Sequence, residues 1–448
     1  MSALAGNNYP TITSIVRKWY VAFQNTIFLP AGVTAGEAYT RVAIDIAAKE
    51  LAGFPTTLSD VYGRLLSYQL FNGANGGVGT TLSGITADSN FSSHNAPYPI
   101  ITALGVRPDR LEQGLWMCIN GFNDSVQYEF HPYESGSWDS NVRAFTPTRY
   151  LGSPLNDGVP LSSSACMTGY DNLGFLAAAS SNVFNFFCAS IPAVNYLMGG
   201  VFGDLLNTCI AMLGVLQTTT YYDEYAVLPN PWFNSTLVPA SLSTAQDLYL
   251  LDGSQGDASV TVGQTVPLWP LIQPERAVDV IIANDNSADT PDNWPNGSSV
   301  YDTYRKAEAA GLRRMPFIPS PDVFVSQGLN KRPVFFGCRD PSAATIIYLP
   351  NVNYTYQSNF PTFELAYNSS QVTGMVGNGN AMVTQNGTIG WPECVACGLM
   401  LKMNNGTLPL RCARCITEYC WNEANSTMPG NGPLARRHGS YMAGHKVW

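Results

Sequence analysis

The sequence predicts an α/β fold in which a layered, mixed sheet is flanked by helices. Four short runs rich in β-branched and apolar residues, each bounded by turn residues, predict buried strands: Leu248–Leu251, Val278–Ala283, Val334–Gly337 and Thr345–Leu349. Helix-like segments lie between these runs, notably Ser299–Gly311. Strands that alternate with helices are typical of layered α/β domains. A cluster of cysteines near the C-terminus predicts that this end of the domain is cross-linked or metal-bound.

The first part of the chain, residues 11–71, predicts mainly helices. One helix is expected over Tyr39–Leu51, and the apolar residues spaced along it are Val42, Ile44, Ala47 and Leu51. A second is expected over Leu58–Phe71, because a Thr-Leu-Ser-Asp cap starts it. Apolar spacing places one group of its residues near one face, namely Val61, Leu65, Tyr68 and Leu70.

The middle of the chain is less regular. The segment NGANGGVGTT (72–81) fails the GxGxxG spacing of a phosphate-binding loop, so a flexible surface loop is expected. Strand-like pieces follow at Gly114–Asn120 and Val126–Phe130, and residues 171–216 are expected to form helices packed on the core. Polar residues interrupt the apolar stretch Ile191–Leu216, which therefore predicts a buried core segment rather than a membrane span.

Composition excludes some classes of function. The 448-residue chain has 23 Lys and Arg against 32 Asp and Glu, a net charge of −9, which disfavours nucleic-acid binding. It holds only four histidines, which weakens both a His-rich metal site and a Ser-His-Asp triad. The N-terminus has no basic or apolar leader region, so it does not read as a secretory signal.

Five of the ten cysteines form a C-x2-C-x14-C-x2-C-x4-C cluster, at Cys394, Cys397, Cys412, Cys415 and Cys420. Paired thiolates at this spacing suit a structural zinc ion. The competing interpretation is a set of disulfides in an oxidising compartment. The fifth cysteine and nine Asn-x-Ser/Thr sequons favour disulfides. One clustered cysteine is then left to pair with a partner outside the cluster, among Cys118, Cys166, Cys188, Cys209 and Cys338.

Three segments could carry chemistry. Asp252 directly follows an apolar strand and precedes Gly253, a position where α/β enzymes place catalytic groups, although a turn aspartate fits as well. Asp285 and Asp289 lack the spacing of a calcium loop, so a carboxylate pair that caps backbone amides is expected. No Gly-x-Ser-x-Gly occurs, and Ser137 in ESGSWD is expected to be structural.

Taken together, long ordered segments resemble the fungal phospholipase B (lysophospholipase) family, which is related to the cytosolic phospholipase catalytic domain. The segments are AGFPTTLSDVYGRLLSYQLF (52–71), YEFHPYESGSWD (128–139), GYDNLGFLAAASSNVFN (169–185), LLDGS (250–254), VPLWPLIQPERAVDVIIANDNSADT (266–290), RPVFFGC (332–338), YLPN (348–351) and WPECVACGLM through CARCITEYCWN (391–422). The resemblance covers nearly the whole chain up to Asn422.

The resemblance implies a hydrolase of fatty-acyl esters that needs no cofactor and no metal. Its members use a Ser-Asp dyad without histidine, and Asp252 matches the aspartate, the general base. It implies lysophospholipid or phospholipid substrates at a micelle or membrane surface, a secreted or cell-surface glycoprotein, and disulfides among the C-terminal cysteines. No catalytic role passes to Asp285 or Asp289.

One departure is serious. The family's nucleophile lies in a GLSGGSW-like elbow, upstream of the region that matches Met1. Residues 1–422 are therefore expected to be the C-terminal portion of an N-terminally truncated catalytic domain. Residues 423–448 are expected to form a divergent, disordered tail. The alternatives are a gene-model fragment, a catalytically inactive lipid-binding paralogue and an intracellular zinc protein.

Overall fold

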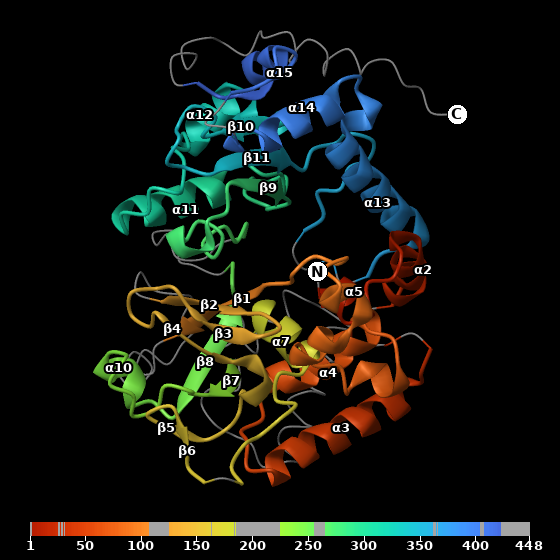
Figure 1. Cartoon of the computed structure of the whole chain (residues 1–448). Coiled ribbons are helices and arrows are strands. Elements are labelled where there is room, and N and C mark those ends of the chain that lie inside the picture. Colours follow the sequence, from red (N-terminus) through yellow and green to blue (C-terminus); the bar gives the residue numbers. More distant parts are fainter. Residues whose placement is uncertain are drawn as a thin grey trace. The chain divides into compact units, whose positions relative to one another are not determined.

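The computed structural model describes residues 2–106, 125–184, 225–254, 265–403 and 407–422, except for residues 26, 28, 29, 31, 163, 183, 362, 363 and 365. The chain divides into two compact units (Figure 1). Unit 1 comprises residues 1–263 with 365–368, and unit 2 comprises the remainder. The single domain predicted over 1–422 stays a prediction, and the tail 423–448 lies outside the described residues. Within those residues, no helix is both long and apolar enough to cross a membrane.

Unit 1 is built on a six-stranded sheet in the order β4-β3-β2-β1-β8-β7, in which every neighbouring pair is antiparallel. The strands are β1 (Ile101–Val106), β2 (Val126–Phe130), β3 (Glu134–Ser137), β4 (Ala144–Pro147), β7 (Ala226–Pro229) and β8 (Asp247–Asp252), and a small hairpin joins β5 (Leu155–Asn156) to β6 (Val159–Pro160). The predicted strands at Val126–Phe130 and Leu248–Leu251 are confirmed. The predicted strand Gly114–Asn120 and the stretch Ile191–Leu216 lie outside the described residues.

Helices pack beside this sheet (Figure 1). They are α1 (Ser2–Ala5), α2 (Ile12–Ala22), α3 (Ala35–Leu51), α4 (Leu58–Leu70), α5 (Ser89–Ser92), α7 (Leu173–Ser180) and α10 (Ala240–Ser243), with 3-10 turns at Ala74–Gly77, Ser83–Ala87 and Thr148–Tyr150. Helix α4 starts at the predicted cap, where Thr57 and Asp60 form a capping box. A Cβ on Gly63 would lie 2.9 Å from the carbonyl oxygen of Gly174, so glycine permits the close approach of α4 and α7.

The structure adds detail to two predictions for unit 1. In α3 the buried face consists of Ala38, Val42 and Ile46, whereas Ile44 and Leu51 are exposed. Positions four apart share a face of a helix, and Ile44 lies two positions from Val42, on the opposite side. The glycine-rich segment 72–81 is not simply a surface loop, because Gly76 and Gly77 are buried against α4 and the residue that follows it.

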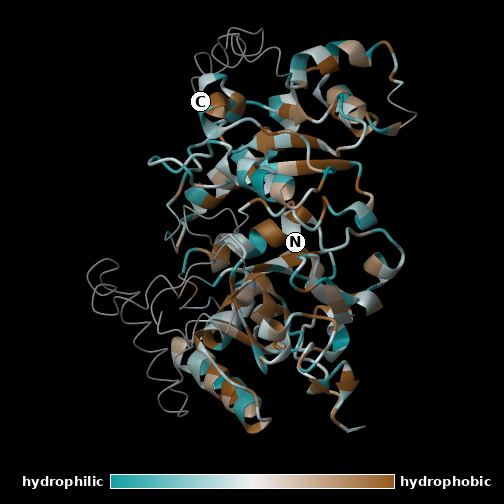
Figure 2. Cartoon of the chain, turned by 90° about the vertical axis from the view of Figure 1, so that its left-hand side faces the viewer, coloured by the Kyte–Doolittle hydropathy of each residue, from teal (hydrophilic) through white to brown (hydrophobic). Residues whose placement is uncertain are grey.

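Unit 2 contains a mixed sheet of three strands, β10 (Val334–Phe336), β11 (Thr345–Pro350) and β9 (Val280–Asp285). The central strand β11 is antiparallel to β10 and parallel to β9. Side chains alternate along β11, so Ile346 and Tyr348 enter one apolar cluster and Ile347 and Leu349 another. Figure 2 shows brown, hydrophobic segments among these strands. All three strands were predicted within two residues of their bounds.

The helices of unit 2 lie on both sides of its sheet: α11 (Ser298–Ala309), α12 (Pro321–Ser326), α13 (Ser369–Thr384), α14 (Trp391–Leu399) and α15 (Cys412–Tyr419), with 3-10 turns at Pro274–Arg276, Leu329–Lys331 and Gln385–Gly387. Helix α11 confirms the prediction at Ser299–Gly311. The buried Asn378 of α13 accepts hydrogen bonds from the backbone N–H groups of Tyr354, Thr355 and Tyr356 and so holds the loop after β11.

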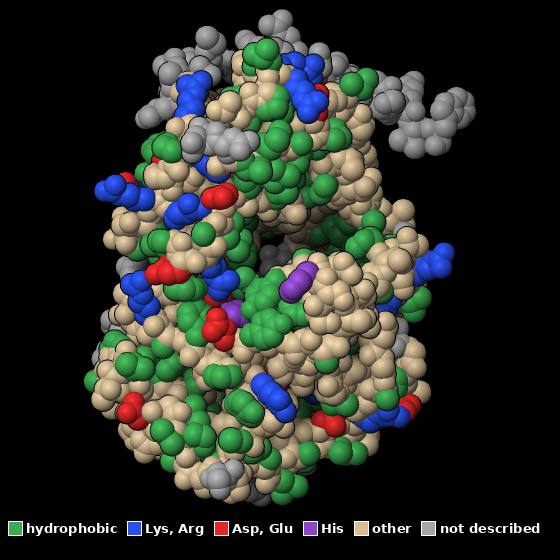
Figure 3. All heavy atoms as spheres, in the orientation of Figure 1, with side chains coloured by type: hydrophobic (Ala, Val, Ile, Leu, Met, Phe, Trp, Pro, Cys, Tyr) green, Lys and Arg blue, Asp and Glu red, His purple; other side chains and the backbone are tan. Residues whose placement is uncertain are grey.

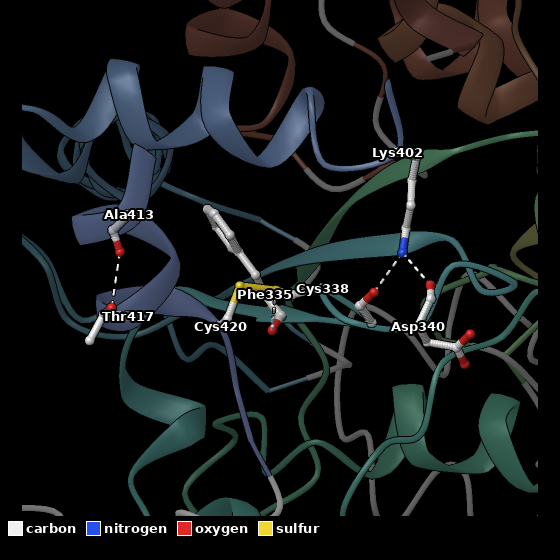
Figure 4. The surroundings of a disulfide bond; sticks show 8 residues. Phe335, Cys338, Asp340, Lys402, Ala413, Thr417 and Cys420 are labelled. Atoms are coloured by element: carbon white, nitrogen blue, oxygen red, sulfur yellow. Dashed lines mark hydrogen bonds between the residues drawn. A yellow bond between two sulfur atoms is a disulfide. The ribbon is translucent and has the colours of Figure 1, made fainter. Parts of the chain in front are cut away.

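Disulfides cross-link the C-terminal part of unit 2. Cys394–Cys415 and Cys397–Cys412 form two rungs between α14 and α15, and Cys338–Cys420 joins the end of α15 to the residues after β10 (Figure 4). This confirms the disulfide interpretation and identifies Cys338 as the partner of the remaining clustered cysteine. All five clustered cysteines are consumed, so the thiolates that the zinc alternative requires are absent from the cluster. Cys166 is a free, exposed thiol.

Replacing Cys397 and Cys412 together by alanine should destabilise unit 2. Their bridge closes a loop of 15 residues, and a loop of this size contributes about 3 kcal/mol by restricting the unfolded chain. Thermal unfolding should therefore occur several degrees lower in the double variant. Cys166→Ala is the matched control and should unfold with the parent. Equal unfolding temperatures for all three proteins would contradict this role for the bridge.

Candidate active site

Asp252 is the last residue of β8, paired with Ala103 of the neighbouring strand β1. The sequence Asp-Gly-Ser that ends the strand forms an Asx turn. In this turn the Asp252 carboxylate accepts hydrogen bonds from the Ser254 backbone N–H (2.8 Å) and from its hydroxyl (2.7 Å). Asp252 thus stands at the end of a buried strand, as the sequence predicted, with its carboxylate fixed by local contacts.

The backbone of Asp252 is held from the helical side of the sheet. Its N–H donates to the carbonyl of Asn182, just after α7, at 3.1 Å. The Asn182 side chain is fully buried and donates to the Ser59 hydroxyl of α4 at 2.9 Å. Its amide oxygen accepts the Phe184 N–H at 3.0 Å. One asparagine therefore links α4, the end of α7 and the end of β8.

Tyr62 of α4 brings a phenol into the same region. Its hydroxyl lies 3.3 Å from the Ser181 hydroxyl, and its ring packs edge-on against Phe184 at 5.6 Å. Burial raises the pKa of Tyr62, the Ser181 hydrogen bond lowers it by less, and the charge of the nearby Asp252 adds the smallest effect, a further rise. The phenol therefore stays neutral and keeps its proton near the carboxylate.

The electrostatic setting of Asp252 favours proton acceptance. Burial raises the pKa of its carboxyl group, and the two hydrogen bonds from Ser254 oppose this rise only in part. A carboxylate with a raised pKa is a stronger base than a solvated one. The arrangement can therefore take a proton from a hydroxyl group placed beside it.

The opposite face of the sheet carries a row of buried polar side chains that the sequence reasoning missed. Gln127, Glu129 and His131 alternate along β2 and just beyond it, each with at most 2% of its surface exposed. The indole N–H of Trp138 donates to Glu129 at 3.1 Å, and His131 Nε2 lies 3.6 Å from the same carboxylate oxygen. The signal was present in the sequence, where V-Q-Y-E-F-H alternates apolar and polar residues in a strand with both faces buried.

Asp285 and Asp289 lie in unit 2, and the structure confirms that they cap backbone amides. Asp285 is fully buried at the end of β9 and accepts the Ser287 N–H (3.0 Å) and the Tyr348 hydroxyl (2.7 Å). Asp289 accepts the Asn296 N–H at 3.1 Å. Among the residues that the structure describes, no three His, Cys, Asp or Glu side chains are grouped so as to hold a metal ion.

Ser137 is structural, as expected. It ends β3, where its buried hydroxyl donates to the Gln127 carbonyl at 2.7 Å and accepts the Asp139 N–H at 3.0 Å. Both interactions hold the edge of the sheet together, and the side chain is directed at its own strand pair.

The fold defines the class of protein to which the chain is similar. The human GIVD cytosolic phospholipase A2 superposes with a TM-score of 0.64 and 17% identity over 89% of this chain and 56% of that one. The same enzyme in complex with a fluorophosphonate inhibitor gives a TM-score of 0.55. At this identity the likeness shows the fold alone, and it confirms the predicted cytosolic phospholipase-like architecture.

The sequence comparisons give the family. The lysophospholipase catalytic domain matches residues 1–426, and the chain belongs to this family. Lysophospholipase 2 of Aspergillus fumigatus is 34% identical over 95% of the chain and 72% of its own length. The lysophospholipase of Penicillium chrysogenum is 36% identical over 87% of the chain and 63% of its own length. Lysophospholipase 1 of Saccharomyces cerevisiae is 33% identical over 94% of the chain and 65% of its own length. The chain thus spans about two thirds of the length of these relatives.

The carboxyl group of Asp302 in unit 2 should make the free energy of unfolding depend on pH. Burial raises the pKa of Asp302 to about 6, and Asp289 adds to the rise. Its proton is bound more tightly in the folded state, so its contribution to stability is present below about pH 4 and is lost as the pH rises through about 6. Unfolding by urea at pH 4 and pH 7 should show this loss in the parent, and Asp302→Asn should remove it.

Asp340→Asn is a control, because Asp340 should change the free energy of unfolding with pH in the opposite direction. The hydrogen bond from Ser342 lowers the pKa of Asp340, so the contribution of this residue is lost as the pH falls. If the free energy of unfolding changed equally with pH in the parent and in Asp302→Asn, Asp302 would not be the source of the loss.

Proposed function

We propose that the chain is the part of a lysophospholipase that carries the general base, Asp252, and that the enzyme hydrolyses fatty-acyl esters of lysophospholipids and phospholipids through a Ser-Asp dyad. The observation that carries this proposal is a partly buried carboxylate of raised pKa, fixed at the end of an interior strand of the sheet, in a chain of the lysophospholipase family. The relatives are named lysophospholipases, which supports the choice of substrate class.

The proposed reaction has two steps. Asp252 takes the proton of a serine hydroxyl while the serine oxygen attacks the acyl carbonyl, and the glycerol oxygen then leaves with that proton to give an acyl-enzyme. In the second step Asp252 takes a proton from water, the hydroxide attacks the acyl carbon, and the serine oxygen leaves and regains a proton. We propose that the serine of the family's GLSGGSW-like elbow supplies the nucleophile in the intact gene product.

Access to a lipid surface is part of the proposal. Among the exposed apolar side chains of unit 1 are Val159 (64%), Leu161 (63%) and Leu237 (79%). The Asp157 N–H donates to the Phe233 carbonyl and its carboxylate accepts the Thr236 N–H, so the loops that carry these side chains lie together. Charged side chains are scattered over the face shown in Figure 3, among hydrophobic and neutral ones. Such a surface suits binding to a micelle or membrane interface.

We also propose that the intact protein is secreted or bound to the cell surface. Disulfides persist in oxidising compartments, and three of them join cysteines of unit 2. The sequon residues Asn90, Asn234 and Asn386 are exposed and so accessible to glycosylation.

Asp252→Asn in the intact gene product should lower lysophospholipid hydrolysis by several orders of magnitude, because the members of a dyad act as a unit. Release of fatty acid from lysophospholipid micelles is the measurement. The matched control is Asp247→Asn, which changes another partly buried aspartate of raised pKa on the same strand and should keep most of the activity.

Activity of Asp252→Asn within tenfold of the parent would refute the role of this residue. An intact protein that binds micelles and releases no fatty acid would favour the alternative of a lipid-binding paralogue without catalysis.

A further inference from the structure

A cavity of about 260 Å³ lies in unit 1, between α3, α4 and the segment that leads into α7. Much of its wall is apolar, and the apolar side chains include Ile46, Phe54, Val78, Met167 and Phe175. Cavities of roughly 150 Å³ with apolar walls already bind benzene. The space in unit 1 is therefore large enough for a chain of several carbon atoms.

Two ion pairs also line this cavity, and each is complete within the protein. Lys49 Nζ lies 2.6 Å from an Asp60 oxygen, and Arg64 Nε lies 3.0 Å from an Asp45 oxygen. The Lys49 ammonium also lies 4.3 Å from the centre of the Phe175 ring, a distance typical of a cation–π contact. Because two positive and two negative charges cancel, an incoming ion finds no unpaired countercharge here. The cavity is suited to an uncharged group.

The cavity is distinct from the candidate active site. Asp60 and Arg64, which line the cavity, are four positions apart and share one side of α4. Ser59 and Tyr62 are three positions apart on the opposite side of the helix, where they contact the residues that follow α7 and hold Asp252. A ligand in the cavity would thus be separated from Asp252 by the helix.

Exposed apolar side chains lie in the chain segments that border the cavity. Leu51 at the end of α3 is 90% exposed and directly precedes the lining residue Ala52. The Met167 N–H donates to the Ser153 hydroxyl at 2.8 Å, just before the hairpin of β5 and β6. Leu161, one of the side chains proposed above to meet a lipid surface, directly follows that hairpin. In Figure 1 the hairpin and α3 both lie at the lower end of unit 1.

We propose that this cavity binds the alkyl chain of a lipid at a site outside the catalytic centre. The choice of a lipid rests on the proposed function, which supplies the lipid surface, but the binding itself does not involve Asp252. An alkyl chain gains free energy by leaving water and needs no hydrogen bond from the paired charges. Met167 is flexible and adapts its shape to such a chain. Lysophospholipids and free fatty acids both carry a chain of this kind.

Photochemical labelling of the intact protein tests the site directly. The probe is decanol with a diazirine near its methyl end, which attaches to neighbouring residues on illumination. Mass spectrometry should find the probe on peptides that contain residues 46–54 and 167–175, which include the apolar wall. Attachment only to peptides that contain Tyr62 or Asp252 would overturn the proposal, because the chain would then occupy the candidate active site alone.

A substitution that fills the cavity should remove the labelling. Met167→Trp should lower attachment to these peptides at least about tenfold, the equivalent of losing two buried CH2 groups. Met403→Trp is the matched control, since Met403 is 56% exposed in unit 2, and it should label like the parent. Thermal unfolding verifies that each variant is folded, and Val78→Phe replaces Met167→Trp if that variant unfolds at a lower temperature. Undiminished labelling in a folded, cavity-filled variant would contradict the assignment.

Competition by unlabelled compounds tests the chemistry of the ligand. The affinity of straight-chain alcohols should rise about fourfold for each added CH2 group and level off once the cavity is full. Hexanoate and hexylammonium should compete no better than hexanol, because the ion pairs leave no free charge. Tighter binding of either ion, or an affinity that does not depend on chain length, would exclude an uncharged alkyl chain as the ligand.

Two further competitors distinguish the sources of the chain. Decanoate represents a free fatty acid, and an ether-linked decyl lysophospholipid, which has no ester to hydrolyse, represents the substrate. The compound that competes more strongly indicates the source, and competition by neither would refute a lipid site. Asp252→Asn should leave the labelling of the cavity unchanged, so a failure of the proposed dyad and a failure of this site are measured separately.

Discussion

The hydrogen bond from the Asp252 N–H to the Asn182 carbonyl is the contact on which the candidate site depends. A carboxylate that is withdrawn from water loses hydration, and its pKa rises unless opposite charges or hydrogen bonds compensate. At Asp252 the compensation is partial, since Ser254 supplies two hydrogen bonds and burial still raises the pKa. Such a group needs a rigid frame, because the chain could otherwise relax and return it to water. Asn182 supplies that frame by joining two helices to the strand end.

The same principle appears in unit 2 with a different outcome. Asp285 is more completely buried than Asp252, yet its carboxylate receives hydrogen bonds from Tyr348 and Ser287 and is closed off from any substrate. Both aspartates follow strands, and their sequences look alike. The difference lies in what surrounds the carboxylate. Both oxygens of Asp285 accept hydrogen bonds, one from Ser287 and the other from Tyr348. At Asp252 the two hydrogen bonds from Ser254 both reach the same oxygen.

The sequence predicted the strands and the N-terminal helices because their signals are local. The apolar run Leu248–Leu251 and the cap before Leu58 each determine their own element. The apolar residues named along α3 do not share one helix face, so their spacing did not identify its buried side, and Leu51 and Ile44 point to solvent. The pairing of Cys338 with Cys420 could not be deduced, because 82 residues separate them and only the fold brings them together. Asn182 and Tyr62 were missed for the same reason, since neither carries a local motif.

The row of buried polar side chains on β2 was missed for a different reason. A strand buried on both faces is expected to be apolar throughout, and β2 departs from this rule at Gln127 and Glu129 while Tyr128 and Phe130 on the other face enter the apolar core. Natural sequences break local rules mainly where function requires it. Glu129 has protein partners that explain its burial. Gln127 has none for its amide among the described residues, although the amide nitrogen packs close to Gly253. The burial of Gln127 is therefore the departure in β2 that the described side-chain contacts do not explain.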